Sequence, residues 1–284
     1  MSTDSLIVIP ARFKSTRLPG KPLRMIGDDT MLHRVYKRCS ETQLDTVVAT
    51  DDDRIISECK EKGMEWVKTL SEHKTGTDRV AEVAVNQLCG PYENYINVQG
   101  DEPFVLVEDI LEINQWIMRK GQTSPNSPSE ISFPDQEEVI CGMCPINDEE
   151  QYWSPNVPKI VLDYDHVSQT TNAAAKLRYI SRAPIPGVKG GMPWPKDEAF
   201  KQVCIYGFKR WQLVFYSDYV KSWPVDDPHE GKSTIEYYED IEILRFFDLG
   251  IDIRMVFLNG TPLAVDTEED LIKANELHEK NPLI

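Results

Sequence analysis

A run of basic residues near the beginning of the sequence has the composition of a phosphate-binding loop. Between Ser5 and Gly27 there are five cations and no Asp or Glu, although the whole chain carries 31 Lys and Arg against 47 Asp and Glu. The cations follow a short apolar segment, and open α/β sheets bind ligands at the carboxyl ends of such strands. Several cations together with backbone N–H groups suit a triphosphate, with a solvated basic patch as the alternative. These residues are Arg12, Lys14, Arg17, Lys21 and Arg24.

Two acidic segments have the form of metal-binding turns. The apolar run Tyr95–Val98 leads through Gly100 into Asp101 and Glu102, and Asp266 follows Val265 at the start of a helical pattern. Mg²⁺ prefers one or two carboxylates, several waters and substrate phosphates, so we predict that Asp101 is a metal ligand. For Asp266, a metal ligand and a helix cap are equally open on these residues alone.

The composition excludes several classes of partner. A formal charge of −16 opposes binding to nucleic acid or an anionic membrane. No run approaches the ~18 apolar residues of a membrane span, and the first residues lack the basic start of a signal peptide. We therefore expect a cytoplasmic protein without a nucleic-acid or membrane partner. Neither GxxxxGK(S/T) nor GxGxxG occurs, so P-loop kinases and Rossmann dehydrogenases lack their central motif here.

The six cysteines are scattered through a chain that is large enough to need no disulfide bonds, and we predict that their thiols are free. Cys141 and Cys144 have a spacing seen in metal sites. No second pair completes such a site, and both residues fall in the strand-like stretch Val139–Ile146. Buried strand cysteines are therefore favoured over a zinc or redox site.

In the first half of the chain, short β-branched runs alternate with amphipathic helical patterns, which indicates an α/β domain with a doubly wound, mainly parallel sheet. The strands are predicted at Leu6–Ile9, Thr46–Ala49, Tyr95–Val98 and Ile140–Pro145. The helices are predicted at Met31–Ser40, Arg54–Lys62, Asp78–Leu88 and Val107–Lys120. The stretch Gly121–Glu138 is rich in Ser, Pro and acidic residues and is typical of a surface loop.

The second half is less regular and predicts a smaller subregion within one domain that spans residues 1–284. We place this subregion at about 159–235. Further strands are expected at Lys159–Leu162, Val203–Phe208 and Ile251–Phe257, with turns at Pro184–Pro195. Helices are expected at Glu236–Leu249 and at Thr267–Glu279, the second opened by a Thr267/Asp270 capping pair.

The segment Ile9–Leu23, which reads IPARFKSTRLPGKPL, resembles the phosphate-binding signature of the 3-deoxy-manno-octulosonate cytidylyltransferases, or CMP-Kdo synthetases. The resemblance continues in the order of that family over nearly the whole chain. The further matching segments are Ala49–Asp52, Thr75–Val83, Asn97–Pro103, Pro155–Asn156 with Lys159, Ser181–Pro186, Ile205–Phe208, Glu236–Arg245 and Val265–Leu271.

This resemblance implies a nucleotide-diphospho-sugar transferase fold, a mixed and mainly parallel sheet sandwiched by helices with a small dimerisation subdomain. It also implies transfer of CMP from CTP to the anomeric hydroxyl of an ulosonic acid, with Mg²⁺ as cofactor, by a homodimer that serves lipopolysaccharide or capsule synthesis. The nucleotide-binding residues by resemblance are Pro10, Ala11, Arg12, Ser15, Arg17, Lys21, Arg79 and Gln99. Of these, Arg12 and Lys21 would be catalytic together with Asp101 and Asp266, and the two aspartates would bind the metal.

By the same resemblance, the sugar acid would contact Arg182, Gln202, Tyr206, Glu236 and Glu239, with Arg182 holding the carboxylate. The chain departs from the family at two positions: Gln202 stands where a histidine is usual, and Ile243 replaces a glutamine. We therefore keep two alternatives open beside Kdo, an acceptor of the sialic, nonulosonic type and, less favoured, a non-catalytic nucleotide-sugar binding module. A changed preference among substituted Kdo analogues also follows from the two replacements.

Overall fold

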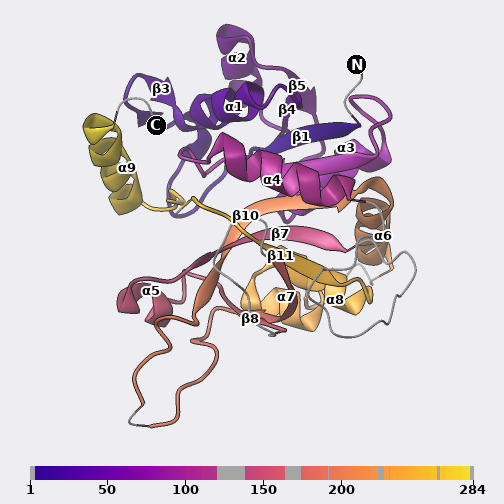
Figure 1. Cartoon of the computed structure of the whole chain (residues 1–284). Helices are drawn as coiled ribbons and strands as arrows, with labels where there is room; N and C mark the ends of the chain where they lie inside the picture. Colours follow the sequence, from indigo (N-terminus) through magenta and orange to yellow (C-terminus); the bar gives the residue numbers. More distant parts are fainter. Residues whose placement is uncertain are drawn as a thin grey trace.

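A nine-stranded mixed sheet forms the centre of the computed structural model, which describes residues 4–119, 138–163, 174–190, 192–222, 227–229, 231–260 and 263–281. The strand order is β5-β4-β1-β6-β10-β7-β11-β9-β8, and β10 also pairs with β8 (Figure 1). These strands are β1 (Ser5–Pro10), β4 (Asp45–Thr50), β5 (Trp66–Lys68), β6 (Asn94–Val98), β7 (Val139–Pro145), β8 (Lys159–Leu162), β9 (Ala174–Ser181), β10 (Phe200–Lys209) and β11 (Ile253–Phe257).

The half of the sheet that carries the basic loop is parallel. Strand β1 pairs with β4 and β6 in parallel, and β4 pairs with β5 in the same way. The helices α1 (Met31–Glu41), α2 (Asp53–Lys62) and α3 (Gly76–Val85) lie in the connections between these strands. The strands and helices predicted for this half are confirmed. Strands β1 and β6 are buried along their whole length, as is typical of central strands in a parallel sheet, although β6 includes Asn94 and Asn97.

The other half of the sheet corrects the prediction of a mainly parallel sheet. Among the described residues, the sheet has four parallel strand pairings and five antiparallel ones. Three of the antiparallel pairings involve β10, a ten-residue strand that lies between β6 and β7, and the other two involve β9. An apolar strand pattern carries no information about strand direction, so the insertion of β10 could not be predicted from periodicity.

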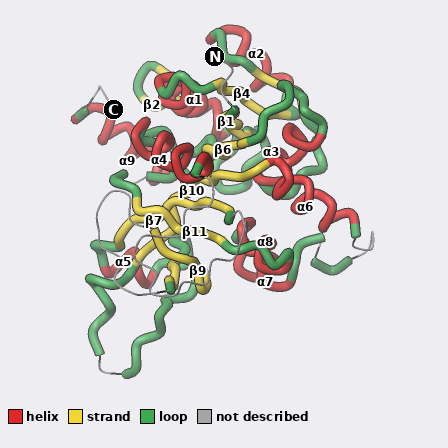
Figure 2. Tube along the Cα trace, turned by 45° about the vertical axis from the view of Figure 1, so that its right-hand side comes forward, coloured by secondary structure: helices red, strands yellow, loops and turns green. Residues whose placement is uncertain are grey.

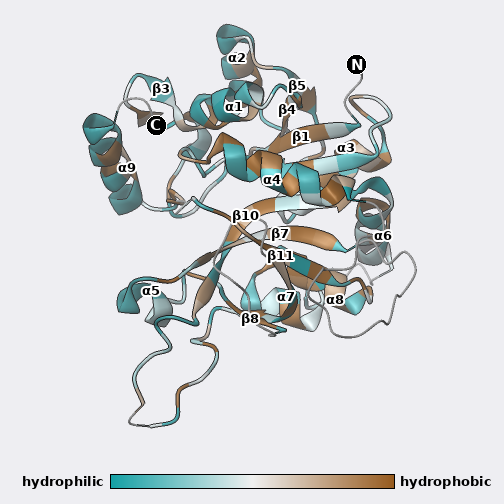
Figure 3. Ribbon diagram, in the orientation of Figure 1, coloured by the Kyte–Doolittle hydropathy of each residue, from teal (hydrophilic) through white to brown (hydrophobic). Residues whose placement is uncertain are grey.

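Helices cover both faces of the sheet and leave two apolar cores (Figures 2 and 3). One face packs against α1, α2 and α4 (Val107–Met118). The other face packs against α3, α6 (Arg210–Lys221) and the segment formed by α7 (Thr234–Glu239), η2 (Glu242–Leu244) and α8 (Arg245–Asp248). A third, smaller core joins the last helix, α9 (Glu268–Lys280), to the basic loop through Leu18, Val265 and Leu271.

The remaining short elements are η1 (Lys21–Leu23), the small hairpin β2 (Met25–Ile26) and β3 (Asp29–Thr30), and α5 (Glu149–Trp153). The loop between β9 and β10 extends away from the sheet at the lower end of Figure 1. Of the predicted loop Gly121–Glu138, only Glu138 is among the described residues, and residues 164–173 likewise lie outside them. No helix in the described part of the chain combines the length and the apolar character needed to cross a bilayer.

The predicted helix Glu236–Leu249 is wrong, because Asp240 adopts the left-handed conformation (φ 51°) and ends α7. The chain then passes through η2 before α8 begins at Arg245. This break allows Arg245 to reach back to Glu236. In a continuous helix two residues nine positions apart are separated by about 13 Å along the axis and cannot form an ion pair.

The six cysteines have free thiols, as predicted. Cys141 and Cys144 are buried in β7, and they lie in the cores on opposite faces of the sheet. An odd spacing in a strand places side chains on opposite faces, so these two sulfurs cannot share one metal ion.

Candidate functional site

The basic loop leaves the sheet at the end of β1, as expected from the sequence. Pro10 and Ala11 are buried at the base of the loop, where the Ala11 N–H donates to the Ala49 carbonyl oxygen at 2.9 Å. Gly20 has φ +68°, and a Cβ added there would lie 3.1 Å from the Phe13 ring. Glycine therefore satisfies both the left-handed turn and the close approach that bring the chain into η1.

Lys21 lies at the first position of η1 and joins the two predicted metal-binding aspartates. Its Nζ lies 2.6 Å from Asp101 Oδ2 and 2.9 Å from Asp266 Oδ1. A second cation, Arg17, contacts the same oxygen of Asp266 at 3.1 Å. The structure thus brings together four of the predicted site residues, from segments more than 240 positions apart in the sequence.

The electrostatics of this cluster follow from its partial burial. Burial opposes the charged form of Lys21, but Asp101 and Asp266 outweigh it and raise the lysine pKa above its ordinary value. Burial likewise acts to raise the pKa of Asp266, yet Lys21 and Arg17 hold that pKa below its ordinary value. The neighbouring Glu102 is buried, and burial followed by the charge of Asp101 raises its pKa to about 8.

A backbone hydrogen bond fixes the two aspartate segments relative to each other. The Val265 N–H donates to the Asp101 carbonyl oxygen at 3.0 Å. The cap alternative for Asp266 is wrong, because Thr267 is the N-cap of α9 and forms a capping box with Asp270. Asp266 precedes the cap, so its carboxylate is available to Lys21 and Arg17 instead of the helix.

The donor set at this point fits Mg²⁺. Asp101 and Asp266 converge on one cation, the Lys21 ammonium, and both offer hard carboxylate oxygens. Glu102 Oε2, immediately behind them, is a buried oxygen without a hydrogen-bond partner. Among the described residues, no group of three or more His, Cys, Asp or Glu side chains is arranged to bind a metal ion. A site with two protein carboxylates leaves the other positions to water and phosphate, as Mg²⁺ prefers.

The other predicted loop residues differ in exposure. Arg12 and Arg17 are exposed, whereas Ser15 is half-buried and its Oγ accepts a hydrogen bond from the Leu18 N–H at 3.4 Å. Arg79 is buried and already bonded: its Nη2 donates to Asp51 Oδ1 at 2.7 Å, and its Nη1 donates to Thr69. The loop therefore has three exposed cations, Arg12, Lys14 and Arg17, whereas the Arg79 guanidinium is bonded to Asp51 and Thr69.

Four of the five predicted sugar-binding residues form two bonded pairs, and the fifth, Glu236, forms a third pair with Arg245. Gln202 and Tyr206 are both buried in β10, where the Gln202 amide donates to the Tyr206 hydroxyl at 3.2 Å. Burial, followed by Cys204 and Glu242, raises the tyrosine pKa well above its ordinary value. Ile243, the second departure from the family, is fully buried in the apolar core beside them.

Arg182 and Glu239 form the second pair, at the end of β9. The Arg182 guanidinium donates to the carbonyl oxygens of Glu239 (2.6 Å), Asp240 (3.0 Å) and Pro155 (3.1 Å). The Glu239 carboxylate accepts from the Arg182 N–H at 2.8 Å. Lys159, fully buried, donates to the Arg182 carbonyl oxygen at 2.6 Å. This cluster holds the end of α7 against β8 and β9.

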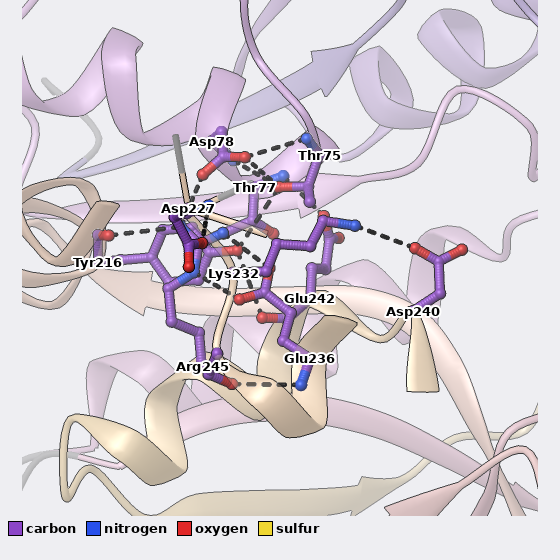
Figure 4. Close-up of polar contacts among 12 residues, drawn as sticks. Thr75, Thr77, Asp78, Tyr216, Asp227, Lys232, Glu236, Asp240, Glu242 and Arg245 are labelled. Carbon is purple, nitrogen blue, oxygen red and sulfur yellow. Dashed lines mark hydrogen bonds and ion pairs between the residues drawn. The ribbon is translucent and has the colours of Figure 1, made fainter. Parts of the chain in front are cut away.

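Glu236 forms the third pair, a buried bidentate ion pair with Arg245 at 2.7 and 2.8 Å (Figure 4). Arg245 also contacts Asp78 Oδ1 at 2.7 Å and lies over the Tyr216 ring. The pair therefore joins α7 to the first turn of α3. Glu242 was not among the predicted site residues, although it lies within the matched segment Glu236–Arg245 and bonds to Gln99 and to the Thr77 N–H.

Comparison with known proteins identifies relatives of the same length. A cytidylyltransferase family model matches residues 6–253. The chain is 35% identical to a 3-deoxy-manno-octulosonate cytidylyltransferase of Marinobacter nauticus, over 96% of this chain and 97% of that protein. It is 34% identical to a protein of the same name from Francisella tularensis subsp. holarctica, over 95% of this chain and 97% of the relative.

Solved structures agree with these sequence relatives. A CMP:2-keto-3-deoxy-manno-octonic acid synthetase complexed with CTP superimposes with a TM-score of 0.75 and 29% identity, covering 98% of this chain and 99% of the other. A glucose-1-phosphate thymidylyltransferase from Bacillus anthracis has a TM-score of 0.58 at 12% identity, over 96% of this chain and 94% of the other, and shares the fold alone.

Proposed function

The chain belongs to the 3-deoxy-manno-octulosonate cytidylyltransferase family, and we propose that it transfers CMP from CTP to the anomeric hydroxyl of Kdo. In this reaction the hydroxyl oxygen of the sugar forms a bond to the α-phosphorus of CTP. The bond between the α-phosphorus and the bridging oxygen of the β-phosphate breaks, pyrophosphate leaves, and the hydroxyl proton is lost to water. The observation that carries this proposal is the convergence of Lys21, Asp101 and Asp266 in a chain related to these enzymes over its whole length.

The basic loop supplies the binding site for the triphosphate in this proposal. Arg12 and Arg17 are exposed cations that can close on the β- and γ-phosphates, while Ser15 and the backbone at Pro10 and Ala11 line the base of the loop. Charge neutralisation and alignment are what phosphoryl and nucleotidyl transfer demand of a protein. Lys21, at the junction of the loop and the two aspartates, serves both phosphate binding and catalysis.

Asp101 and Asp266 are the residues proposed to hold Mg²⁺. When bound, the metal neutralises charge on the phosphates and helps to align the attacking and leaving oxygens. Lys21 occupies the space between the carboxylates in the structure. We therefore place its ammonium group on the triphosphate during the reaction, where it exchanges aspartate oxygens for phosphate oxygens.

The sugar acid is proposed to bind on the α7 side of the sheet, near Gln202, Tyr206 and Arg182. Arg182 retains guanidinium N–H bonds beyond the three that it donates to carbonyl oxygens, because an arginine has five. Glu239 and Glu236 act on the pocket by fixing Arg182 and Arg245, respectively. The names of the relatives favour Kdo over a nonulosonic acid as the acceptor, and they favour an enzyme over a non-catalytic binding module.

The cellular setting of the proposal is a cytoplasmic homodimer that activates Kdo for lipopolysaccharide synthesis, with residues of about 159–235 at the dimer interface. The resemblance to the family supports each of these points. This part of the chain includes the projecting loop between β9 and β10, which carries the exposed Met192. The exposed Trp153 lies just before it in the sequence.

A pyrophosphate-release assay tests the proposed reaction. CTP, Kdo and Mg²⁺ together should release pyrophosphate, and omission of any one should abolish the signal. The assay is repeated with amino-substituted Kdo and with a nonulosonic acid. Faster turnover with a nonulosonic acid would overturn the acceptor, and equal turnover with UTP or ATP would overturn the nucleotide.

A further inference from the structure

Glu242 lies where the acceptor side of the molecule meets the nucleotide side. It opens η2, and both of its carboxylate oxygens accept hydrogen bonds: Oε1 from Gln99 Nε2 at 2.8 Å, and Oε2 from the Thr77 N–H at 2.9 Å. Gln99 follows directly after β6, two positions before Asp101. Figure 4 shows Glu242 between Thr77 and the ion pairs of Arg245. The carboxylate therefore links η2 to the turn that bears a proposed metal ligand.

The chemistry of this contact fixes the orientation of the Gln99 amide. Gln99 Nε2 donates to one Glu242 oxygen while the Thr77 N–H donates to the other, so the Gln99 group that faces the carboxylate is the NH₂. The Gln99 carbonyl oxygen is then the amide atom left for a ligand. Gly76 confines the amide from another side, since a Cβ there would lie 3.1 Å from both amide atoms.

Glu242 is itself held rigidly. Its carbonyl oxygen accepts from the Tyr216 hydroxyl at 3.3 Å, and Arg245, three residues later, is anchored to Glu236 and to Asp78 of the α3 capping box. The Thr77 N–H that donates to Glu242 belongs to the first turn of α3, where backbone N–H groups lack partners within the helix. These contacts fix the position of the Glu242 carboxylate, and the carboxylate in turn fixes the Gln99 side chain through their hydrogen bond.

We propose that Glu242 is a positioning residue that holds the Gln99 side-chain oxygen as a hydrogen-bond acceptor for the cytidine part of CTP. The donor on the nucleotide is the 4-amino group of cytosine, which donates hydrogen bonds and does not accept them. This inference rests on the proposed function, because it assumes that Gln99 borders the nucleoside. Glu242 acts through Gln99 and has no contact of its own with CTP.

Glu242→Gln inverts the arrangement without changing the size of the side chain. Its amide oxygen continues to accept from the Thr77 N–H, so its NH₂ turns toward Gln99. Gln99 must then rotate to present its oxygen to residue 242, which leaves its NH₂ facing a donor on the nucleoside. The loss of one hydrogen bond and the facing of two donors should lower kcat/KM for CTP about 10-fold or more.

The double variant Gln99→Glu/Glu242→Gln restores the contact with its direction reversed. The new amide at position 242 donates to one oxygen of the new carboxylate at position 99, and the second oxygen of that carboxylate accepts from the nucleoside. The double variant should therefore recover most of the loss that Glu242→Gln causes. Glu58→Gln is the matched control, since Glu58 is a half-buried glutamate on α2 that accepts from Thr30 at 2.9 Å.

The measurement is kcat/KM for CTP, UTP and 2′-deoxy-CTP in each variant, with Kdo saturating. UTP lacks the 4-amino donor and deoxy-CTP lacks the 2′-hydroxyl, so a merely structural loss lowers all three nucleotides alike. We expect Glu242→Gln to lower the CTP:UTP ratio about 10-fold and to leave the CTP:deoxy-CTP ratio unchanged, because a 2′-hydroxyl can accept a hydrogen bond as well as donate one. A CTP:UTP ratio within twofold of the Glu58→Gln control, or an effect on the KM for Kdo alone, would overturn the proposal.

Gln99→Ala keeps the test decisive if Glu242→Gln does not fold, because it removes the amide and leaves the Glu242 bond to Thr77 in place. An unchanged CTP:UTP ratio in Gln99→Ala would also overturn the proposal. Failure of the proposed function is a separate result, since the wild-type protein would then release no pyrophosphate from CTP and Kdo.

Discussion

Replacement of Lys21 by Met separates the charge of this residue from its shape. In the structure, Lys21 Nζ bonds to Asp101 at 2.6 Å and to Asp266 at 2.9 Å. Methionine keeps a similar unbranched stem but brings no cation, so the two carboxylates are left with Arg17 alone on one side. We therefore expect Lys21→Met to bind a divalent cation more tightly than the wild-type protein when no nucleotide is present.

The magnitude follows from the two bonds that a metal must displace. Hydrogen bonds to charged groups each contribute about 1.5–3 kcal/mol. The side chains of Lys21, Asp101 and Asp266 are 18%, 24% and 33% exposed, so water screens the pair and the lower end of that range applies to both bonds together. A gain of about 1.4 kcal/mol corresponds to a tenfold lower Kd for the metal.

Titration with Mn²⁺, followed by the electron paramagnetic resonance signal of the free ion, measures this affinity without turnover. Lys37→Met is the matched control, because Lys37 pairs with Asp29 at 3.1 Å on α1 and lies outside the site. We expect a Kd about tenfold lower in Lys21→Met, an unchanged Kd in the control, and a loss of about 10²-fold or more in kcat/KM for CTP. Mn²⁺ affinity that is unchanged or weaker in Lys21→Met would refute the competition between the ammonium group and the metal.

Three further predictions concern charge and burial. Asp101→Asn should lower kcat about 10²-fold or more with a smaller change in KM for CTP, because the lost charge acts in the transition state; steady-state kinetics with near-normal kcat would place the metal elsewhere. Arg245→Met should cost about 3–5 kcal/mol of unfolding free energy in urea, since Glu236 would stay buried without its cation and the half-buried Asp78 would lose the same partner; a loss below ~1 kcal/mol would contradict this. Burial lowers the pKa of Lys159 to about 8, below the ordinary 10.5, so the folded state disfavours the charged form of this lysine. The free energy of unfolding of the wild-type protein, measured relative to that of Lys159→Met, should therefore rise by up to about 3 kcal/mol from pH 8 to 10.5. A difference between the two proteins that does not change with pH would contradict this.

The nucleotide side of the molecule could be predicted from the sequence because its signals are local. Strand β1 is a continuous apolar run, the loop after it has one sign of charge, and Asp101 follows β6 within three residues. Each of these features depends on neighbours in the chain. The contact of Lys21 with Asp266 spans 245 positions, and only the matched family motifs indicated it.

The acceptor side could not be predicted in the same way, because its geometry depends on contacts between distant segments. The left-handed conformation of Asp240 breaks an otherwise helical pattern, and the gain is the ion pair between Arg245 and Glu236. Glu242 gains its role from Gln99, 143 positions earlier. Likewise, the antiparallel placement of β10 between β6 and β7 leaves no mark in the strand pattern itself.

Formation of the bond between CMP and Kdo can be observed by nuclear magnetic resonance with Kdo labelled with ¹³C at C2, the anomeric carbon. The protein is incubated with CTP, Mg²⁺ and the labelled sugar, and the C2 resonance is followed over time. If the anomeric oxygen attacks the α-phosphorus, the C2 signal shifts and becomes split by coupling to ³¹P while pyrophosphate accumulates in equal amount. A C2 signal that stays unsplit while CTP is consumed would contradict the reaction proposed for this chain.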